Sequence, residues 1–329
     1  MLAIVIRRLG NAALVMLVVA FVAFVIFQFL GDPVQLMLNE QASAAEREAL
    51  RVRLGLDQPV IMQFFSFLLR ALQGDFGVSY RNQQDVIMLI AERFPATFEL
   101  VMVATVLALG IGIPLGVLAA INPRSLAARA TRLISMVGVS VPAFVVGIVL
   151  ILIFSVELNW LPAFGRGDVV HIGRWSTGLL TPSGRIALIM PAISLALFQI
   201  SFITRLVTAE MLEVLRTDYI KFARARGLSD RAVNFHHALK NCLMPVVTMT
   251  GMMIGDLIAF ALVTETVFQW PGMGLLFVQA VTFIDIPVMA AYLMIVSFIF
   301  VTLNTIVDLI YVLVDPRLLH GMAGGARAH

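Results

Sequence analysis

Acidic side chains within apolar segments are the residues best placed to do chemistry in this sequence, and Asp256 is the clearest example. A carboxylate at the centre of a bilayer costs about 2.5–3.5 kcal/mol on insertion scales unless it faces protein or water. Asp256 could therefore line a pore and contact a passing substrate, for example at an ammonium group. The alternative is a structural hydrogen bond to a neighbouring helix of this or another chain. Asp256 is a candidate pore-lining residue, and the sequence leaves both roles open.

The motifs of well-known catalytic sites are missing from the sequence. A P-loop needs Gly-Lys-Ser/Thr to hold phosphates, but neither of the two lysines, Lys221 and Lys240, follows a glycine. The motifs His-Glu-x-x-His and Gly-x-Ser-x-Gly are missing too, and an intramembrane hydrolase would need a second aspartate matched to Asp256. A single cysteine, Cys242, excludes an internal disulfide and a Cys-based metal cluster. We expect a chain that is not an enzyme, with no catalytic, metal or cofactor site of its own.

Composition identifies the environment of the chain. Of its 329 residues 60% are hydrophobic and only 13% charged, which is typical of a polytopic membrane protein. The net charge is +3, but the basic residues lie beside apolar runs and form no single patch. Membrane lipid is therefore an expected partner and nucleic acid is not.

Six apolar stretches approach or exceed the ~20 residues needed to cross a hydrocarbon core. They are Leu9–Leu30, Leu100–Ile121, Leu133–Val156, Ile186–Val207, Pro245–Phe268 and Val288–Tyr311. The first is longer than the apolar part of a signal peptide and has no convincing cleavage site, so we interpret it as an uncleaved span. The expected fold is an all-α integral membrane protein with six transmembrane helices.

Basic residues gather in alternate connections between these stretches. Arg7 and Arg8 precede the first span, three arginines and no acid follow the second, and a larger basic group follows the fourth. The connection after the fifth span, Gln269 to Pro287, contains Asp285 and no Lys or Arg. By the positive-inside rule both termini are cytoplasmic (N-in/C-in).

Two long connections are then external. Residues 31–96 are mixed in charge and should form a folded element with short helices, lying against the membrane surface or a partner. Residues 158–185 are rich in Gly and Pro and indicate a loop. We expect residues 1–95 to hold the first span and its external loop, 96–312 a core of five helices, and 313–329 a cytoplasmic tail.

The segment Asp218–Gly227, DYIKFARARG, is basic and amphipathic. In a helix Tyr219, Phe222 and Ala223 would share one face, Thr217 or Asp218 could cap its start, and Gly227 would suit a left-handed end. Ser229 could cap a second helix that runs toward Pro245, the expected start of the fifth span. The segment could dock onto another protein or lie on anionic lipid, and periodicity alone does not decide between these.

The run DYIKFARARGLSDRAV, followed by HHALKNCLMPVVT, resembles the cytoplasmic coupling loop of the dipeptide/oligopeptide permease family, the membrane subunits of binding-protein-dependent ABC importers. Further matching runs extend along the chain. They are RLGLDQPV (53–60), GDFGVSY (74–80), AERFPATFEL (91–100), SVPAF (140–144), TAEMLEVLRTDY (208–219), TETVFQWPGMG (264–274) and VDLIYVLVDPR (307–317). Their order and spacing resemble the B-type subunit over nearly the whole chain.

This resemblance implies a type I ABC importer permease in a bacterial cytoplasmic membrane. The chain would form half of a pore for di-/oligopeptides or related small compounds, with a second homologous permease subunit, two ATPase subunits that bind ATP and Mg, and an external substrate-binding protein. Within the loop 208–244, the implied ATPase-coupling residues are Tyr219, Phe222, Ala223, Arg224, Arg226 and Gly227.

The sequence departs from the wider importer pattern at two places. Lys221 and Phe222 replace the expected Glu and Ala before Ala223, and Asp256 and Phe260 replace expected small residues. The first departure looks typical of the peptide branch, whereas the second puts pore-lining roles carried over from the family in doubt.

Two other classes of function remain as alternatives. An ion-gradient-driven secondary transporter would predict inverted repeats and unwound or charged mid-span sites, and the sequence shows neither. An intramembrane hydrolase is the more remote alternative. Among substrates, dipeptides, oligopeptides, glutathione, nickel chelates and opines all stay open.

Overall fold

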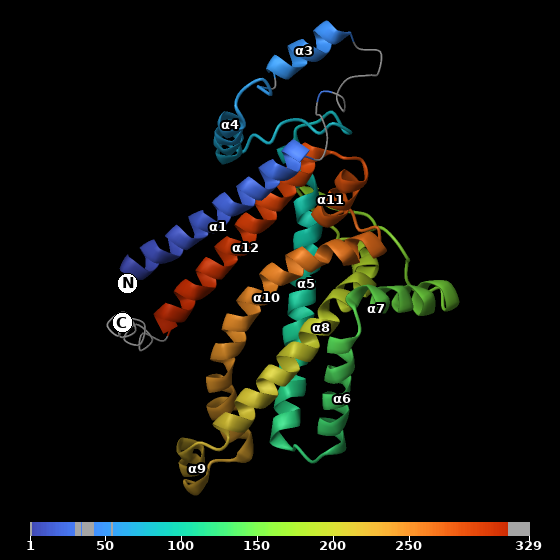
Figure 1. Ribbon diagram of the computed structural model, residues 1–329. Helices are drawn as coiled ribbons and strands as arrows, with labels where there is room; N and C mark the ends of the chain where they lie inside the picture. Colours follow the sequence, from blue (N-terminus) through green and yellow to red (C-terminus); the bar gives the residue numbers. More distant parts are fainter. Residues whose placement is uncertain (1, 30–33, 35–42, 54, 315–329) are drawn as a thin grey trace.

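The computed structural model describes residues 2–29, 34, 43–53 and 55–314, and most of them are helical. Five of the described helices are long and apolar enough to cross a membrane. They are contained in α1 (Leu2–Phe29), α5 (Val86–Ile121), α8 (Pro182–Val214), α10 (Leu239–Val267, with the π-helical segment η2, Ala232–Ala238, before it) and α12 (Ile286–Val314). Figure 1 shows α1 and α12 side by side, while α5, α6, α8 and α10 form the rest of the bundle. The expected all-α membrane architecture is confirmed.

The third expected span is broken. It consists of α6 (Leu126–Ser140), α7 (Ala143–Leu150) and the π-helical segment η1 (Ile151–Glu157). The axes before and after the break differ by 104°, and six spans result if the bent pair counts as one. The break falls at Pro142, which has no N–H to donate and disfavours helix in the residue before it.

Two helices begin before the apolar spans that were expected within them. α5 begins at Val86, long before Leu100, and Pro95 and Pro114 lie inside it. The helix before Pro245 does not stop there, because η2 runs directly into α10 and Pro245 lies within α10. The predicted cap at Ser229 is confirmed, since its hydroxyl accepts a hydrogen bond from the Ala232 N–H (3.3 Å).

The seam between α5 and α8 forms the centre of the bundle, and small residues allow its close approach. A Cβ at Gly116 would lie 2.6 Å from Val207 Cβ and 2.8 Å from the Thr204 carbonyl oxygen. The Thr204 and Thr208 hydroxyls donate to the carbonyls of Gly112 (3.3 Å) and Gly116 (3.2 Å). Glycines and hydroxyl donors at a helix seam are a usual basis of packing in lipid, where apolar burial drives association little.

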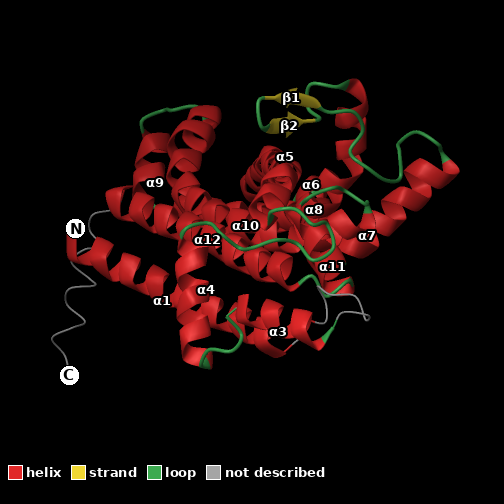
Figure 2. Ribbon diagram, turned by 90° about the horizontal axis from the view of Figure 1, so that it is seen from above, coloured by secondary structure: helices red, strands yellow, loops and turns green. Residues whose placement is uncertain are grey.

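The two ends of the bundle differ in what they carry. At one end, here the α9 end, the short helix α9 (Asp218–Ala225) connects α8 to η2. The opposite end, here the hairpin end, carries several short elements. These are α3 (Ala44–Arg53), α4 (Val60–Leu72), α11 (Met273–Thr282) and the antiparallel strands β1 (Val170–Ile172) and β2 (Trp175–Thr177). Figure 2 shows the hairpin beside α5, with α3 and α4 on the opposite side of the molecule.

The short helices α3 and α4 confirm the expected helical content of the first long connection. The second long connection, expected only as a loop, contains the hairpin. Most of the expected tail, from residue 315 on, lies outside the described residues.

Candidate functional site

The helix α9 ends as its local sequence predicts, but it begins at Asp218 without the predicted side-chain cap. Thr217 precedes it with extended backbone (φ −67°, ψ 154°), although its hydroxyl donates to the Val214 carbonyl (2.6 Å) and does not cap the helix. Gly227 follows with φ +79°. The N–H of Leu228 bonds the Ala223 carbonyl (3.3 Å), and that of Gly227 bonds the Arg224 carbonyl (2.9 Å). These two bonds form a Schellman motif, which ends a helix at a left-handed residue.

The helix has two apolar faces, and one residue was predicted on the wrong face. Tyr219 and Phe222 are 42% and 63% exposed, as a docking face requires. Ala223 is only 7% exposed and packs with Ile220 into the core of the chain itself. The expectation that Ala223 lies on the outward face is therefore wrong, because Ile220 and Ala223 together form the inner face.

Basic side chains surround the exposed aromatic residues of α9. The Arg226 guanidinium lies 5.7 Å from the centre of the Phe222 ring, and Arg224 is exposed beside it. The Tyr219 hydroxyl accepts a hydrogen bond from the Asn241 amide of α10 (2.6 Å). We call Tyr219, Phe222, Arg224 and Arg226 the α9 surface; it combines aromatic area with positive charge.

The inner face of α9 joins it to the spanning helices. Ile220 and Ala223 belong to one buried cluster that contains residues of α5, α8, η2 and α10. The other members are Val117, Ala120, Ile203, Val207, Met211, Val233, Ala238, Cys242, Val246 and Met253. Because close-packed side chains transmit displacement, a force on α9 reaches α8 and α10.

Asp256 lies on an exposed face of α10. Its neighbours on this face include Met252 (38% exposed) and Phe260 (64% exposed). Within the described part of the chain, none of the hydrogen bonds or ion pairs involves Asp256. Its carboxylate is thus open to water, to a solute or to another protein chain.

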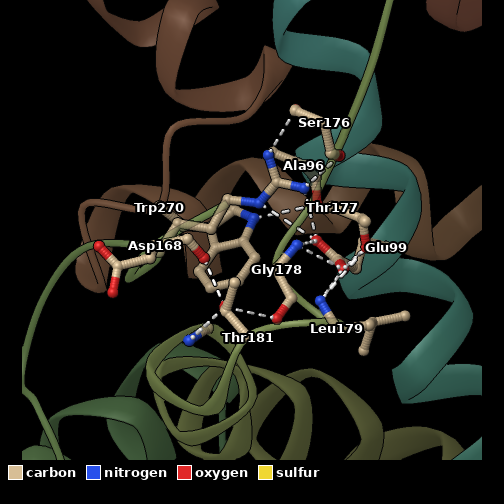
Figure 3. Close-up of polar contacts among 11 residues, drawn as sticks. Ala96, Glu99, Asp168, Ser176, Thr177, Gly178, Leu179, Thr181 and Trp270 are labelled. Atoms are coloured by element: carbon tan, nitrogen blue, oxygen red, sulfur yellow. Dashed lines mark hydrogen bonds and ion pairs between the residues drawn. The ribbon is translucent and has the colours of Figure 1, made fainter. Parts of the chain in front are cut away.

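The sequence missed a second acid in an apolar helix, Glu99 of α5, which is buried in an ion pair. Figure 3 shows its carboxylate enclosed by the chain that follows β2. Arg166 donates to Glu99 Oε2 from Nη2 (2.5 Å) and Nε (3.2 Å), and the two side chains are 6% and 4% exposed. Thr177 Oγ1 (2.8 Å) and the N–H groups of Gly178 (3.1 Å) and Leu179 (2.9 Å) donate to Glu99 Oε1.

A second buried carboxylate, Glu265 of α10, lies near the same part of α5. It accepts hydrogen bonds from Thr97 Oγ1 (2.6 Å) and the Leu275 N–H (3.0 Å). Thr97 Oγ1 in turn accepts from the Met273 N–H (2.8 Å), and a Cβ at Gly272 would overlap the Glu265 carboxylate. The runs AERFPATFEL and TETVFQWPGMG thus meet in space. Asp256 was selected as an acid inside an apolar segment. Glu99 and Glu265 also fit that description, so the same criterion could have found them.

A further contact at the hairpin end ties the chain before α5 to α12. Asp285 accepts hydrogen bonds from Ser79 Oγ (2.5 Å) and from the N–H groups of Tyr80 (3.1 Å) and Arg81 (3.4 Å). The Arg81 guanidinium lies 3.6 Å from the centre of the Phe283 ring. Burial, followed by the charge of Asp285, raises the pKa of the Tyr80 hydroxyl. Tyr80 therefore stays neutral over the physiological range.

The long apolar helices, with an amphipathic helix between two of them, are the architecture of a polytopic membrane protein. Comparisons with known proteins agree. Residues 112–320 match the family described as binding-protein-dependent transport system inner membrane component, and residues 1–101 match the model of the N-terminal part of such components.

Named relatives cover nearly the full chain. The di/tripeptide transport system permease protein DppB of Pseudomonas aeruginosa is 36% identical, over 97% of this chain and 99% of its own length. The oligopeptide transport system permease protein AppB of Bacillus subtilis is 38% identical, with the same two coverages. The methionine ABC transporter MetNI in an inward-facing form shares the fold, with a TM-score of 0.53 at 19% identity over 69% of this chain and 96% of that one. This chain belongs to the family of binding-protein-dependent inner membrane components, as an ABC transporter permease of the peptide-transport type.

Proposed function

We propose that this chain forms half of the translocation pore of an ATP-driven importer for di-/oligopeptides or related small compounds. The observation that carries the proposal is the double role of α9. Its outer side offers Tyr219 and Phe222 to another protein, while Ile220 and Ala223 fix its inner side to the spanning helices. A helix held in this way is suited to coupling the movement of an ATPase to the bundle.

The proposed cycle is alternating access. An external binding protein delivers substrate, and closure of the ATPase pair displaces α9 and, through the buried cluster beneath it, α8 and α10. Two packings of the helices would then alternate, each favoured by a different bound state. The α9 surface and Gly227, which sets the end of the helix, are the proposed coupling residues.

Asp256 is the proposed pore residue. Its exposed carboxylate on α10 would face the second permease subunit across the pore and attract the ammonium group of a passing peptide. Exposure in the isolated chain supports this role over a hydrogen bond within the chain. The nearby exposed Phe260 would narrow the same passage.

The proposed partners supply functions for which this sequence has no motif. ATP and Mg would bind to two ATPase subunits, because the sequence has no P-loop. We propose that the α9 end is cytoplasmic, with both termini inside, because the connection around α9 is rich in Arg. We keep the proposed division into residues 1–95, 96–312 and 313–329.

The alternatives find less support. An intramembrane hydrolase needs acids that reach a substrate, whereas the buried Glu99 and Glu265 are occupied by donors from the chain. A secondary transporter would be driven by an ion gradient and would not need the exposed α9 surface to bind an ATPase.

Uptake experiments separate these functions. The complete complex, in proteoliposomes with labelled dipeptide and binding protein outside, should accumulate peptide when ATP is present inside and should continue after a protonophore collapses the proton gradient. The purified chain alone should not hydrolyse ATP. Uptake that stops with the gradient, or ATP hydrolysis by a preparation free of ATPase subunits, would overturn the proposal.

A further inference from the structure

The short helix α4 has three different sectors around its circumference. One sector packs against α1 and α12: Phe64, Phe67, Leu68 and Ala71 contact the buried group Ala20, Ala23, Ala290 and Met294. A second sector is polar, with Ser66 and Arg70 beside a cavity of about 500 Å³. The third sector is apolar and open. It consists of Ile61 (63% exposed), Met62 (57%), Phe65 (55%), Leu69 (60%) and Leu72 (77%).

The neighbours of α4 place it at membrane depth. The Phe64 ring lies 5.9 Å from that of Phe21 and 5.4 Å from that of Phe24, both edge to face. Phe21 and Phe24 belong to the membrane-spanning part of α1, Ile6–Ile26, close to its end. α4 therefore lies against the apolar part of a spanning helix, near the level where that helix leaves the hydrocarbon.

The length and direction of α4 exclude a span. Its 13 residues correspond to about 20 Å of helix, less than the ~30 Å of a hydrocarbon core. In Figure 1 α4 is seen nearly along its axis while α1 runs across the picture, so the two helices cross steeply. A short helix with one apolar and one cationic or polar sector, lying across a spanning helix, has the features of an interfacial helix.

We propose that the open apolar sector of α4 is inserted between phospholipid acyl chains at the hairpin end of the bundle. Lipid is the occupant that the surroundings favour, because the sector continues into the exposed apolar surface of α1. Phe21 is itself 55% exposed where it meets Phe64. With this sector in lipid, the exposed Arg70 of the adjacent polar sector would be within reach of phosphate groups. The helix anchors the element formed by α3 and α4 to the membrane beside α1.

Site-directed fluorescence in the complete complex, reconstituted in phosphatidylcholine nanodiscs, tests this directly. In a Cys242→Ala background, Phe65→Cys and the matched control Ser66→Cys are each labelled with a bimane probe. Phospholipid with a nitroxide near the headgroup reports lipid contact, and aqueous iodide reports exposure to water. For a side chain between acyl chains we expect about twofold or stronger quenching of the Phe65→Cys probe by the nitroxide lipid. Iodide should affect the Ser66→Cys probe more.

Other quenching patterns overturn the proposal. Quenching of the Phe65→Cys probe by iodide alone would show that the sector faces water. Protection from both quenchers would show that the second permease subunit or the binding protein covers it. A second measurement needs no substitution: a lipid-dissolved diazirine should, on photolysis, label α4 of the unaltered complex at Ile61, Phe65 or Leu69. A peptide map with label on α1 but none on α4 would contradict lipid contact.

Discussion

Two ion pairs, one at each end of the bundle, differ in how far their side chains are exposed. At the α9 end Lys221 and Asp218 are 2.8 Å apart, with side chains 67% and 96% exposed. At the hairpin end Arg166 and Glu99 are 2.5 Å apart, with side chains 6% and 4% exposed. An exposed pair contributes about 0–1 kcal/mol, whereas removing one partner of a buried pair costs about 3–5 kcal/mol.

This difference separates a part that holds the fold from a part that is open to a partner. At the hairpin end the buried Glu99 carboxylate is satisfied within the chain, by donors from β2, the residues after it and Arg166. The α9 end leaves cationic and aromatic side chains exposed on a helix whose other face is fixed. Substitutions at the hairpin end should therefore change stability, and substitutions on the α9 surface should change coupling.

The largest expected effect on stability comes from Arg166→Met. This change leaves the Glu99 carboxylate buried without its cation, so the free energy of unfolding should fall by about 3–5 kcal/mol. The matched control is Lys221→Met, which removes the cation of the exposed pair and should cost about 0–1 kcal/mol. The unfolding temperature of the purified complex, followed by intrinsic fluorescence, measures both. If the unfolding temperature fell equally in the two variants, the buried ion pair would contribute no more to stability than the exposed one.

A smaller loss of stability is expected for Thr97→Val. The Thr97 hydroxyl donates to Glu265 and accepts from the Met273 N–H, and a buried group left unsatisfied costs about 1–3 kcal/mol. Thr217→Val at the α9 end loses one bond at a partly buried site and should cost less, about 1 kcal/mol. If Thr97→Val unfolded at the same temperature as the unaltered complex, the contact between α5 and the chain after α10 would not hold the hairpin end together.

A stability loss no larger than that of Thr97→Val, but a clear effect on coupling, is expected for Gly227→Val. Gly227 has φ +79° and no atom near the position of a Cβ, so the change is purely conformational and costs about 1–2 kcal/mol. The end of α9 would be redirected, and ATP hydrolysis stimulated by loaded binding protein should fall. Gly227→Asn is the control, because Asn tolerates the left-handed region. Normal stimulation in Gly227→Val would show that the direction of the helix end is unimportant.

Local patterns predicted the local features of this molecule. The start of α9, its left-handed end at Gly227 and the cap at Ser229 depend on neighbouring residues only. The apolar runs likewise predicted the spanning helices. The size of the bend at Pro142 could not be predicted from the apolar run, because a proline inside such a run kinks some helices and ends others, as the intact helix around Pro114 shows.

Contacts between distant segments could not be predicted in the same way. Glu99 and Arg166 are 67 positions apart, and Thr97 and Glu265 are 168 apart. The face of α9 was ambiguous for a related reason. Tyr219, Ile220, Phe222 and Ala223 are all apolar or aromatic, so an eight-residue helix offers two apolar faces and only the packing of the bundle selects the inner one. Ala223→Glu would thus place a charge in the core of this chain and would not test docking alone.

The central claim is that the α9 surface couples this permease to an ATPase, and Phe222→Glu tests it most directly. Phe222 is exposed and outside the core, so the variant should fold and assemble, while a charge in a packed interface should cost about 2 kcal/mol or more. ATP hydrolysis by the complete complex, stimulated by loaded binding protein, and peptide uptake should both fall by at least about tenfold. Ser229→Asp, which adds the same charge nearby and keeps the helix cap, should leave both near normal. Full stimulation and uptake in the Phe222→Glu complex would contradict the account.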